Sequence, residues 1–108
     1  MSLDERVLRQ IDLNILVTFL VIFRERGVSR AAHALNITQP AVSNSLGRLR
    51  KHFNDPLFVR RGGYVEATGK AIALAAILEP ALVRVQVAIS SGTTENSATD
   101  SCLAGLDD

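Results

Sequence analysis

The stretch that decides the fold lies at residues 27–46 and reads GVSRAAHALNITQPAVSNSL. It holds two short helical patterns joined by a tight connection. Ser29 is expected to cap the first helix, because its hydroxyl can accept a hydrogen bond from an unpaired backbone N–H. In the connection, Asn36 tolerates left-handed geometry, Ile37 can fill the angle between the helices, and Thr38 can cap the second helix. The stretch therefore predicts a helix-turn-helix.

The second helix divides into an apolar face and a polar face. At about 100° per residue, one narrow stripe collects Val42, Leu46, Leu49 and Phe53. The opposite face carries Pro40, Ser43, Asn44, Gly47, Arg48 and Lys51. A helix that enters the major groove must bury one face and offer hydrogen-bonding groups on the other. Arg48, Arg50 and Lys51 follow towards its end, where phosphate contacts are expected. An ordinary amphipathic surface helix is the alternative, which the neighbouring segments disfavour.

One of those segments is a helix that precedes the pair. We expect Asp12 to cap it and Gly27 to end it. Its apolar stripe contains Leu13, Leu16, Phe19, Leu20 and Phe23. This stripe would supply the third wall that a helix-turn-helix needs.

The other segment follows the pair and is typical of a β-hairpin. Leu57–Arg60 and Tyr64–Ala67 alternate in polarity and are joined by Arg61-Gly62-Gly63. Such a hairpin would be the wing of a winged helix. Arg60 and Arg61 at its tip are placed to reach the DNA backbone or minor groove. Two merely solvated arginines are the alternative.

Residues 71–91 form a long pattern that is apolar on most of its circumference, with Pro80 inside it. The apolar side chains are Ile72, Leu74, Ile77, Leu78, Leu82, Val83, Val85, Val87 and Ile89. Excess apolar surface of this kind indicates a partner. A membrane span is the competing interpretation, which we disfavour because charged residues interrupt the run before it reaches about twenty clean apolar residues.

Taken together, these motifs resemble the N-terminal DNA-binding domain of LysR-type transcriptional regulators. The resemblance covers residues 12–91 and is greatest to the branch of nodulation and aromatic-degradation regulators. It is carried by Asp12-Leu13-Asn14, Ser29-Arg30-Ala31-Ala32, Thr38-Gln39-Pro40-Ala41-Val42-Ser43, Asp55-Pro56-Leu57-Phe58-Val59-Arg60 and Thr68. Two departures are Val28, where many members have serine, and Asn44, where arginine is frequent. The second predicts an operator that differs from those of relatives.

The resemblance implies a mostly α fold with a small β-hairpin wing, a winged helix-turn-helix followed by a long linker helix. Its DNA-binding positions would be Ser29, Arg30, Thr38, Gln39, Pro40, Ser43, Asn44, Arg48, Lys51, Arg60 and Arg61. The linker helix would form a homodimer through Ile72, Leu74, Ile77, Leu78, Leu82, Val85 and Ile89. The expected partner is double-stranded DNA carrying an inverted repeat, with recognition helices in successive major grooves.

The charge distribution agrees with a nucleic-acid partner. Residues 1–91 contain all twelve basic side chains and seven acidic ones, a net charge of +5, whereas residues 92–108 carry −4. Between Arg24 and Lys70, nine basic residues face three acidic ones. A basic surface attracts phosphates and makes affinity fall with salt.

Three regions are expected along the chain: the winged helix-turn-helix at 1–67, the linker or dimerisation helix at 68–91, and a flexible acidic tail at 92–108. We expect this chain to lack the effector-binding domain of full-length members, through which a small-molecule effector would act. We favour an excised DNA-binding piece over a naturally short member or an artificial tail. One cysteine and no secretory signal suit the cytoplasm.

An enzyme is the hypothesis from another class, and the sequence disfavours it. His33, His52 and Cys102 lack metal-ligand spacing, and no glycine-rich phosphate loop is present. We therefore expect no cofactor, no metal and no catalytic residue. A further alternative is an interaction module that dimerises with full-length relatives without recognising DNA itself.

Overall fold

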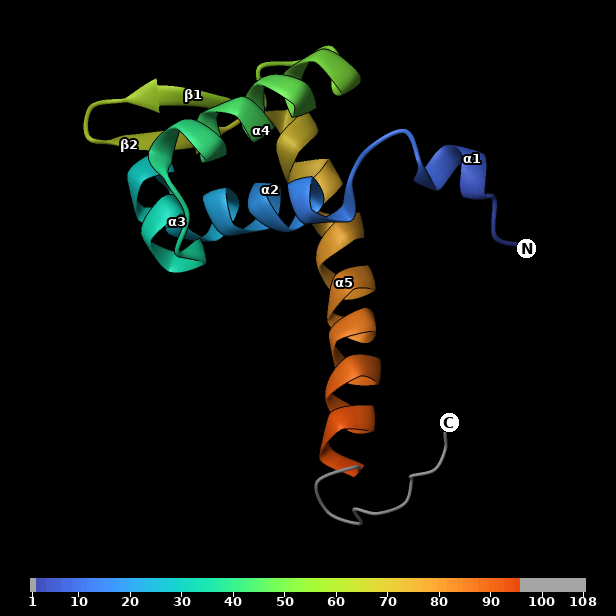
Figure 1. Cartoon of the computed structure of the whole chain (residues 1–108). Helices are drawn as coiled ribbons and strands as arrows, with labels where there is room; N and C mark the ends of the chain where they lie inside the picture. The colour runs from blue at the N-terminus through green and yellow to red at the C-terminus, as the bar shows by residue number, and fades with distance from the viewer. Residues whose placement is uncertain (1, 96–108) are drawn as a thin grey trace. The chain divides into compact units, whose positions relative to one another are not determined.

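The structure is a computed structural model that describes residues 2–95. The elements in chain order are α1 Glu5–Leu8, α2 Leu13–Glu25, α3 Val28–Leu35, α4 Gln39–Phe53, β1 Phe58–Arg61, β2 Tyr64–Ala67 and α5 Gly69–Glu95 (Figure 1). The chain divides into two compact units, Met1–Leu78 and Glu79–Asp108, which are described separately. The predicted fold class, mostly helical with a hairpin wing and a long final helix, is confirmed.

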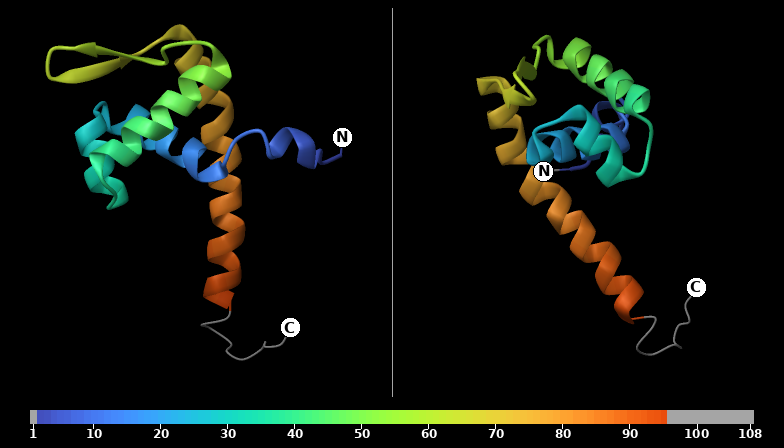
Figure 2. Two further views of the ribbon diagram at one scale, coloured as in Figure 1. Left: turned by 45° about the horizontal axis from the view of Figure 1, so that its top comes forward. Right: turned by 90° about the vertical axis from the view of Figure 1, so that its left-hand side faces the viewer.

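The core of the first unit lies where α2, α3 and α4 pack against one another (Figure 2). Phe19 and Ile22 of α2 are completely buried, together with Val42 and Leu49 of α4. Fully burying a side chain of this size contributes about 1.5–3 kcal/mol. On α3 the buried positions include Ala31, whose small side chain allows close approach. Hydrophobic burial thus holds the second helix of the pair by one face only.

The predicted stripe of α2 is only partly correct. Leu16 and Phe19 are buried, and Leu20 and Phe23 are half-buried, but Leu13 is 51% exposed. Leu13 is the first residue of the helix, directly after the capping residue, and lies at the edge of the core. The cap itself is confirmed, because the Asp12 carboxylate accepts the Asn14 N–H at 2.8 Å.

The connection between α2 and α3 differs from the prediction. Arg26, and not Gly27, takes the left-handed conformation, with φ of 60° and its N–H bonded to the Ile22 carbonyl at 2.8 Å. Because Arg26 reverses the chain, α3 begins at Val28, and Gly27 is its extended N-cap. Ser29 therefore lies inside the first turn and does not cap the helix, so that prediction was wrong.

The turn of the helix-turn-helix matches its prediction at both capping positions. Asn36 is left-handed with φ of 56°, and the Ile37 N–H reaches back to the Ala32 carbonyl at 3.0 Å. The Thr38 hydroxyl accepts the Ala41 N–H at 3.2 Å, and Pro40 lies in the first turn of α4. Ile37 is exposed and does not fill the angle between the helices as expected.

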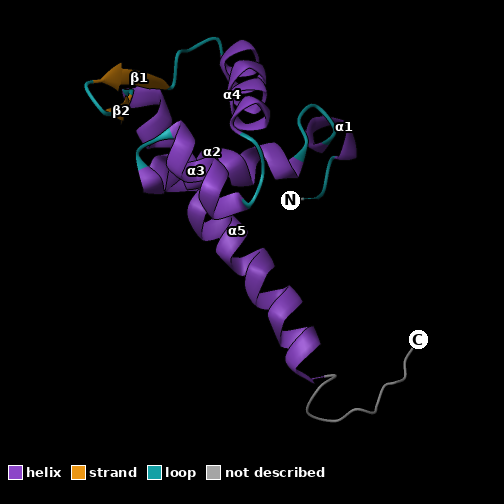
Figure 3. Cartoon of the chain, turned by 60° about the vertical axis from the view of Figure 1, so that its left-hand side comes forward, coloured by secondary structure: helices purple, strands orange, loops and turns teal. Residues whose placement is uncertain are grey.

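The hairpin is antiparallel, with Phe58 opposite Ala67 and Arg61 opposite Tyr64 (Figure 3). Its turn is therefore Gly62-Gly63 alone, and Arg61 belongs to β1 instead of the turn. Gly62 has φ of 60°, a conformation that costs glycine little. The Val65 N–H donates to the Arg26 carbonyl at 3.0 Å, which ties the hairpin to the α2–α3 connection.

Helix α5 begins after Thr68, whose hydroxyl accepts the Ala71 N–H at 3.1 Å. It ends at Glu95, so residues 92–95 are helical although we expected them in the tail. The rest of the expected tail, including Cys102, lies outside the described residues. Pro80, which has no N–H to donate, is inside the helix.

The apolar side chains of α5 are covered only in part. Within the first unit Ala71 and Ala75 are buried and Leu74 and Leu78 half-buried, whereas Ile72 and Ile77 are exposed. Within the second unit Leu82 is half-buried, while Val85 and Ile89 are exposed. By length and composition alone, residues 69–91 would suffice to cross a membrane. One such helix is weak evidence for a membrane span, so the interpretation of α5 as a dimerisation helix stays a prediction.

Candidate nucleic-acid interface

The polar face of α4 is open to solvent along its whole length. Val42, Leu46 and Leu49 are buried on the opposite face, as predicted. The exposed face carries Pro40, Ser43, Asn44, Gly47, Arg48 and Lys51, and Gln39 is exposed beside it in the first turn of the helix. No atom lies within 4 Å of the position that a Cβ on Gly47 would occupy, so nothing in the first unit covers the middle of this face. We call these seven residues the polar face of α4.

A small groove lies where the N-terminal end of α4 meets α3 and the hairpin. It has a volume of about 240 Å³ and is lined in part by Ser29, Arg30, Gln39 and Arg60. The N-cap of α3, Gly27, has no side chain to satisfy the first N–H groups of that helix. Unpaired N–H groups at a helix start favour an anion. The groove therefore combines backbone donors with two arginines.

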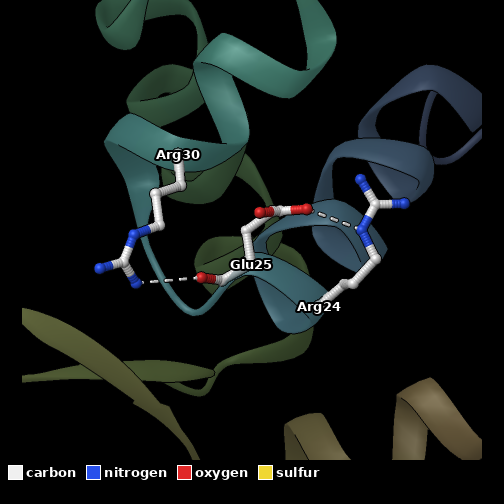
Figure 4. Close-up of polar contacts among 3 residues, drawn as sticks. All are labelled: Arg24, Glu25 and Arg30. Carbon is white, nitrogen blue, oxygen red and sulfur yellow. Dashed lines mark hydrogen bonds and ion pairs between the residues drawn. The ribbon is translucent and has the colours of Figure 1, made fainter.

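Arg30 is held near this groove by the main chain of the preceding helix. Figure 4 shows the Glu25 carboxylate turned towards Arg24, which it contacts at 2.9 Å, while Arg30 reaches the Glu25 main-chain carbonyl at 3.4 Å. Because the carboxylate is engaged elsewhere, it does not neutralise Arg30. The Arg30 guanidinium has five N–H donors, so it retains donors for another acceptor.

The two wing arginines are placed differently from each other. Both are exposed on β1. Arg61 forms an ion pair with Glu66 across the hairpin, at 2.8 Å, whereas no ion pair involves Arg60 within residues 2–95. An exposed pair of this kind contributes only about 0–1 kcal/mol. Arg61 can therefore leave Glu66 and pair with a phosphate at a small cost in free energy, whereas Arg60, within the described part of the chain, has no ion pair to break first.

Arg50 has a structural role that its sequence position did not predict. Its guanidinium donates to the Pro56 carbonyl at 2.8 Å and to the Phe58 carbonyl at 3.0 Å. We expected a phosphate contact, but these two bonds direct it to the base of the hairpin. Arg50 thus ties the end of α4 to β1, and Arg48 and Lys51 remain the exposed cations of this part of the helix.

Asp55 is a second residue whose role the sequence pattern missed. One of its carboxylate oxygens accepts the Leu57 N–H at 2.9 Å and the Thr68 hydroxyl at 2.8 Å. Leu57 has a positive φ of 65°, which this bond helps to hold. The Asp-Pro pair at a helix end signals a turn, but only the fold shows that Asp55 also fixes the residue that caps α5.

No group of three or more potential metal-ligating side chains occurs within the described residues. His33 is exposed on α3. The ring of His52 lies edge-on to Phe53, with centroids 4.8 Å apart. Recognition by surface contacts is the chemistry that the polar face of α4 supports.

Helix α4 buries an apolar stripe and exposes a polar face. Two supporting helices precede it and a hairpin follows it, and this arrangement defines a winged helix-turn-helix domain. The family described as "Bacterial regulatory helix-turn-helix protein, lysR family" matches residues 13–71. This chain belongs to the LysR family, and those residues are the helix-turn-helix DNA-binding domain of a transcriptional regulator.

Several curated relatives are regulators. The HTH-type transcriptional regulator LeuO of Escherichia coli is 44% identical over 85 residues, which are 79% of this chain and 27% of LeuO. Nodulation protein D 2 of Sinorhizobium fredii is 42% identical over 81 residues, 75% of this chain and 26% of the relative. NagR of Ralstonia, a transcriptional activator, is 46% identical over 84 residues, 78% of this chain and 28% of NagR. The chain thus spans about a quarter of the length of these relatives.

Solved structures show the same fold. The probable transcriptional regulator PA0477 of Pseudomonas aeruginosa superposes with a TM-score of 0.73 at 39% identity, over 78% of this chain and 28% of its own. The BenM DNA-binding domain, in complex with catB site 1 DNA, gives a TM-score of 0.70 over 82% of this chain and 98% of its own. At 24% identity, the second likeness shows the fold alone.

Proposed function

We propose that this chain recognises an inverted-repeat operator in double-stranded DNA as a homodimer, with α4 of each protomer in the major groove. The observation that carries the proposal is the polar face of α4, which is exposed from Gln39 to Lys51 while the opposite face is buried. This geometry is what a helix needs in order to enter a groove about 12 Å wide.

The base contacts would come from the N-terminal half of this face. Asn and Gln side chains pair with adenine through two hydrogen bonds, so Gln39 and Asn44 are suited to that base. Ser43 can contact several base edges, and Pro40 can pack against a thymine methyl group. These four residues would therefore determine which sequence is bound.

The phosphate contacts would flank the base contacts. Ser29, Arg30 and Arg60 line the groove beside the N-terminal end of α4, and Arg61 adds a charge once it leaves Glu66. The Thr38 hydroxyl accepts the Ala41 N–H and still has its own proton to donate. Arg48 and Lys51 are exposed towards the other end of α4. These contacts would supply affinity without sequence preference.

The dimer would form through α5. In the first unit Ile77 is 67% exposed, and in the second unit Ile89 is 65% exposed. Exposed apolar residues along one helix need a cover in water, and a second copy supplies it for both chains at once. Ile72, Leu74, Leu78, Leu82 and Val85 would complete this interface. We further propose that the protein acts in the bacterial cytoplasm, and that any small-molecule effector binds in the part of the longer relatives that this chain does not span.

The test is selection of bound duplexes from a randomised library at two salt concentrations, followed by sequencing. An enriched inverted repeat at both concentrations is the expected result. Binding that is uniform across sequences and lost with salt would contradict the proposal and favour an interaction module. The role of α5 is tested by sedimentation in buffer and by flotation with vesicles. A dimer that stays in the aqueous phase supports the proposal. A chain that binds vesicles contradicts the proposal that α5 forms a dimer.

A further inference from the structure

A second opening lies at the opposite end of α4 from the hairpin groove. It has a volume of about 650 Å³, and we call it the N-terminal cleft. Its lining includes Arg9, Asp12, Arg48, Lys51 and His52. Figures 1 and 3 show α1 on the side of α4 that faces away from the hairpin. The segment that follows α1 therefore forms one wall of the cleft, and the end of α4 forms another.

The charges around the N-terminal cleft are mostly positive and unpaired. Arg9, Arg48 and Lys51 are exposed, and none of them forms an ion pair with a carboxylate within residues 2–95. Asp12 is the acidic residue of the lining, and its carboxylate already accepts the Asn14 N–H. The cleft thus has three cationic side chains and one carboxylate, which already accepts a hydrogen bond. This excess of positive charge is suited to binding an anion.

The position of the cleft favours a phosphate of the DNA backbone over a free anion. Gln39 and Lys51 are twelve positions apart on α4, a separation of about 18 Å along a helix. The major groove is about 12 Å wide. A helix lying in the groove can therefore present its two ends to the two backbones that border it. In the proposed complex the hairpin groove would face one of them, which leaves the other for the N-terminal cleft.

We infer that Arg9, together with Arg48 and Lys51, binds a backbone phosphate on the side of α4 opposite the hairpin. This inference rests on the proposed DNA binding and adds a contact from outside the family match, which begins at residue 13. Arg9 lies in the short segment between α1 and α2, so the N-terminal segment becomes part of the DNA interface. The hairpin and this segment would then hold the duplex from both sides of the groove.

The first experiment measures binding at several salt concentrations for wild type and Arg9→Ala. Each lost phosphate contact reduces the slope of log affinity against log salt by about 0.9, so a dimer with two contacts should lose about 1.8. Arg6→Ala is the matched control, because Arg6 is exposed on the adjacent helix α1, contacts Asp4 at 3.6 Å and does not line the cleft. Arg9→Lys should keep the wild-type slope. Equal slopes for wild type and Arg9→Ala would overturn the inference.

The second experiment locates the phosphate. Single methylphosphonate linkages, which lack the negative charge, are placed one by one along the selected duplex. One linkage beside each half-site should weaken wild type more than Arg9→Ala, because Arg9→Ala keeps only Arg48 and Lys51 at that phosphate. If no linkage distinguishes the two proteins, while inorganic phosphate alone binds wild type and not Arg9→Ala, the cleft binds a free anion and the inference is wrong.

These experiments separate the inference from the proposed function. A backbone contact acts on any duplex, so the slopes are measured on the selected duplex and on an unrelated one. If no sequence is selected, the proposed function fails, and the slopes on the unrelated duplex still decide the role of Arg9. If a sequence is selected and Arg9→Ala behaves like Arg6→Ala, the inference alone fails.

Discussion

Helices α4 and α5 meet the solvent in opposite ways. Helix α4 buries its apolar stripe within its own unit and exposes a polar face, whereas α5 exposes apolar residues such as Ile77 and Ile89. The first helix is complete as packed, and its free face is suited to a polar ligand. The second has exposed apolar side chains, which are suited to packing against another apolar surface. The proposed DNA recognition by α4 and the proposed self-association through α5 rest on this difference.

The largest effect on DNA binding is expected from a substitution that disrupts the proposed dimer interface of α5. Ile77→Asp places a charge in the proposed dimer interface and should give a folded monomer. Loss of the second half-site contact should reduce operator affinity by a factor on the order of 10²–10⁴. Sedimentation equilibrium and operator binding measure the two effects, with Ile77→Leu as the control. If Ile77→Asp is still a dimer and binds the operator with full affinity, α5 is not the dimer interface and the proposed difference between the two helices is wrong.

The next effect concerns the buried side of α4. Leu49 is completely buried, so Leu49→Ala should lower the free energy of unfolding by about 2–5 kcal/mol. Lys51→Ala, on the exposed side of the same helix, should change it by less than about 0.5 kcal/mol. Urea unfolding followed by circular dichroism measures both. Equal losses would mean that α4 does not have one buried and one free face.

A smaller effect is expected on the exposed side. Asn44→Ala should weaken binding to the selected operator by about 1–3 kcal/mol and leave binding to unrelated duplexes unchanged. Competition titrations with the two duplexes measure the difference. Unchanged discrimination between them would show that base recognition lies elsewhere on the domain.

The smallest expected effect distinguishes two arginines of the same helix. Arg48→Ala should reduce the salt slope by about 0.9 per contact and leave stability unchanged. Arg50→Ala should do the reverse, because its bonds to the Pro56 and Phe58 carbonyls hold the hairpin base. Since Arg50 is exposed and water can replace it, the unfolding free energy should fall by about 0.5–1.5 kcal/mol. Salt titrations and urea unfolding of both variants test this assignment. Identical behaviour would show that it is wrong.

The elements with regular periodicity could be predicted from sequence. The stripe Val42, Leu46 and Leu49 fixed the buried side of α4, and Thr38 and Asn36 marked the turn, because each depends on neighbours within a few residues. The helix boundaries that were predicted wrongly depend on which of two neighbouring residues takes the left-handed conformation, and residue propensities do not determine this. Arg26 took the left-handed position where Gly27 was expected.

The contacts that escaped prediction join segments whose positions only the fold determines. The two bonds of Arg50 need the β1 backbone beside α4, and the bond between Asp55 and Thr68 spans thirteen positions of the chain. Helix α1 has only four residues and no buried side chain, so it produced no periodic signal. The side chains predicted to contact bases and phosphates are exposed, and their contacts remain predictions.

Whether two copies of α4 enter the major groove can be tested by dimethyl sulfate protection of the selected duplex, which reports which groove is covered and at how many places. We expect protection of guanine N7 in the major groove at two patches, separated by about 34 Å or a multiple of that distance. A single patch, or protection confined to adenine N3 in the minor groove, would contradict this expectation.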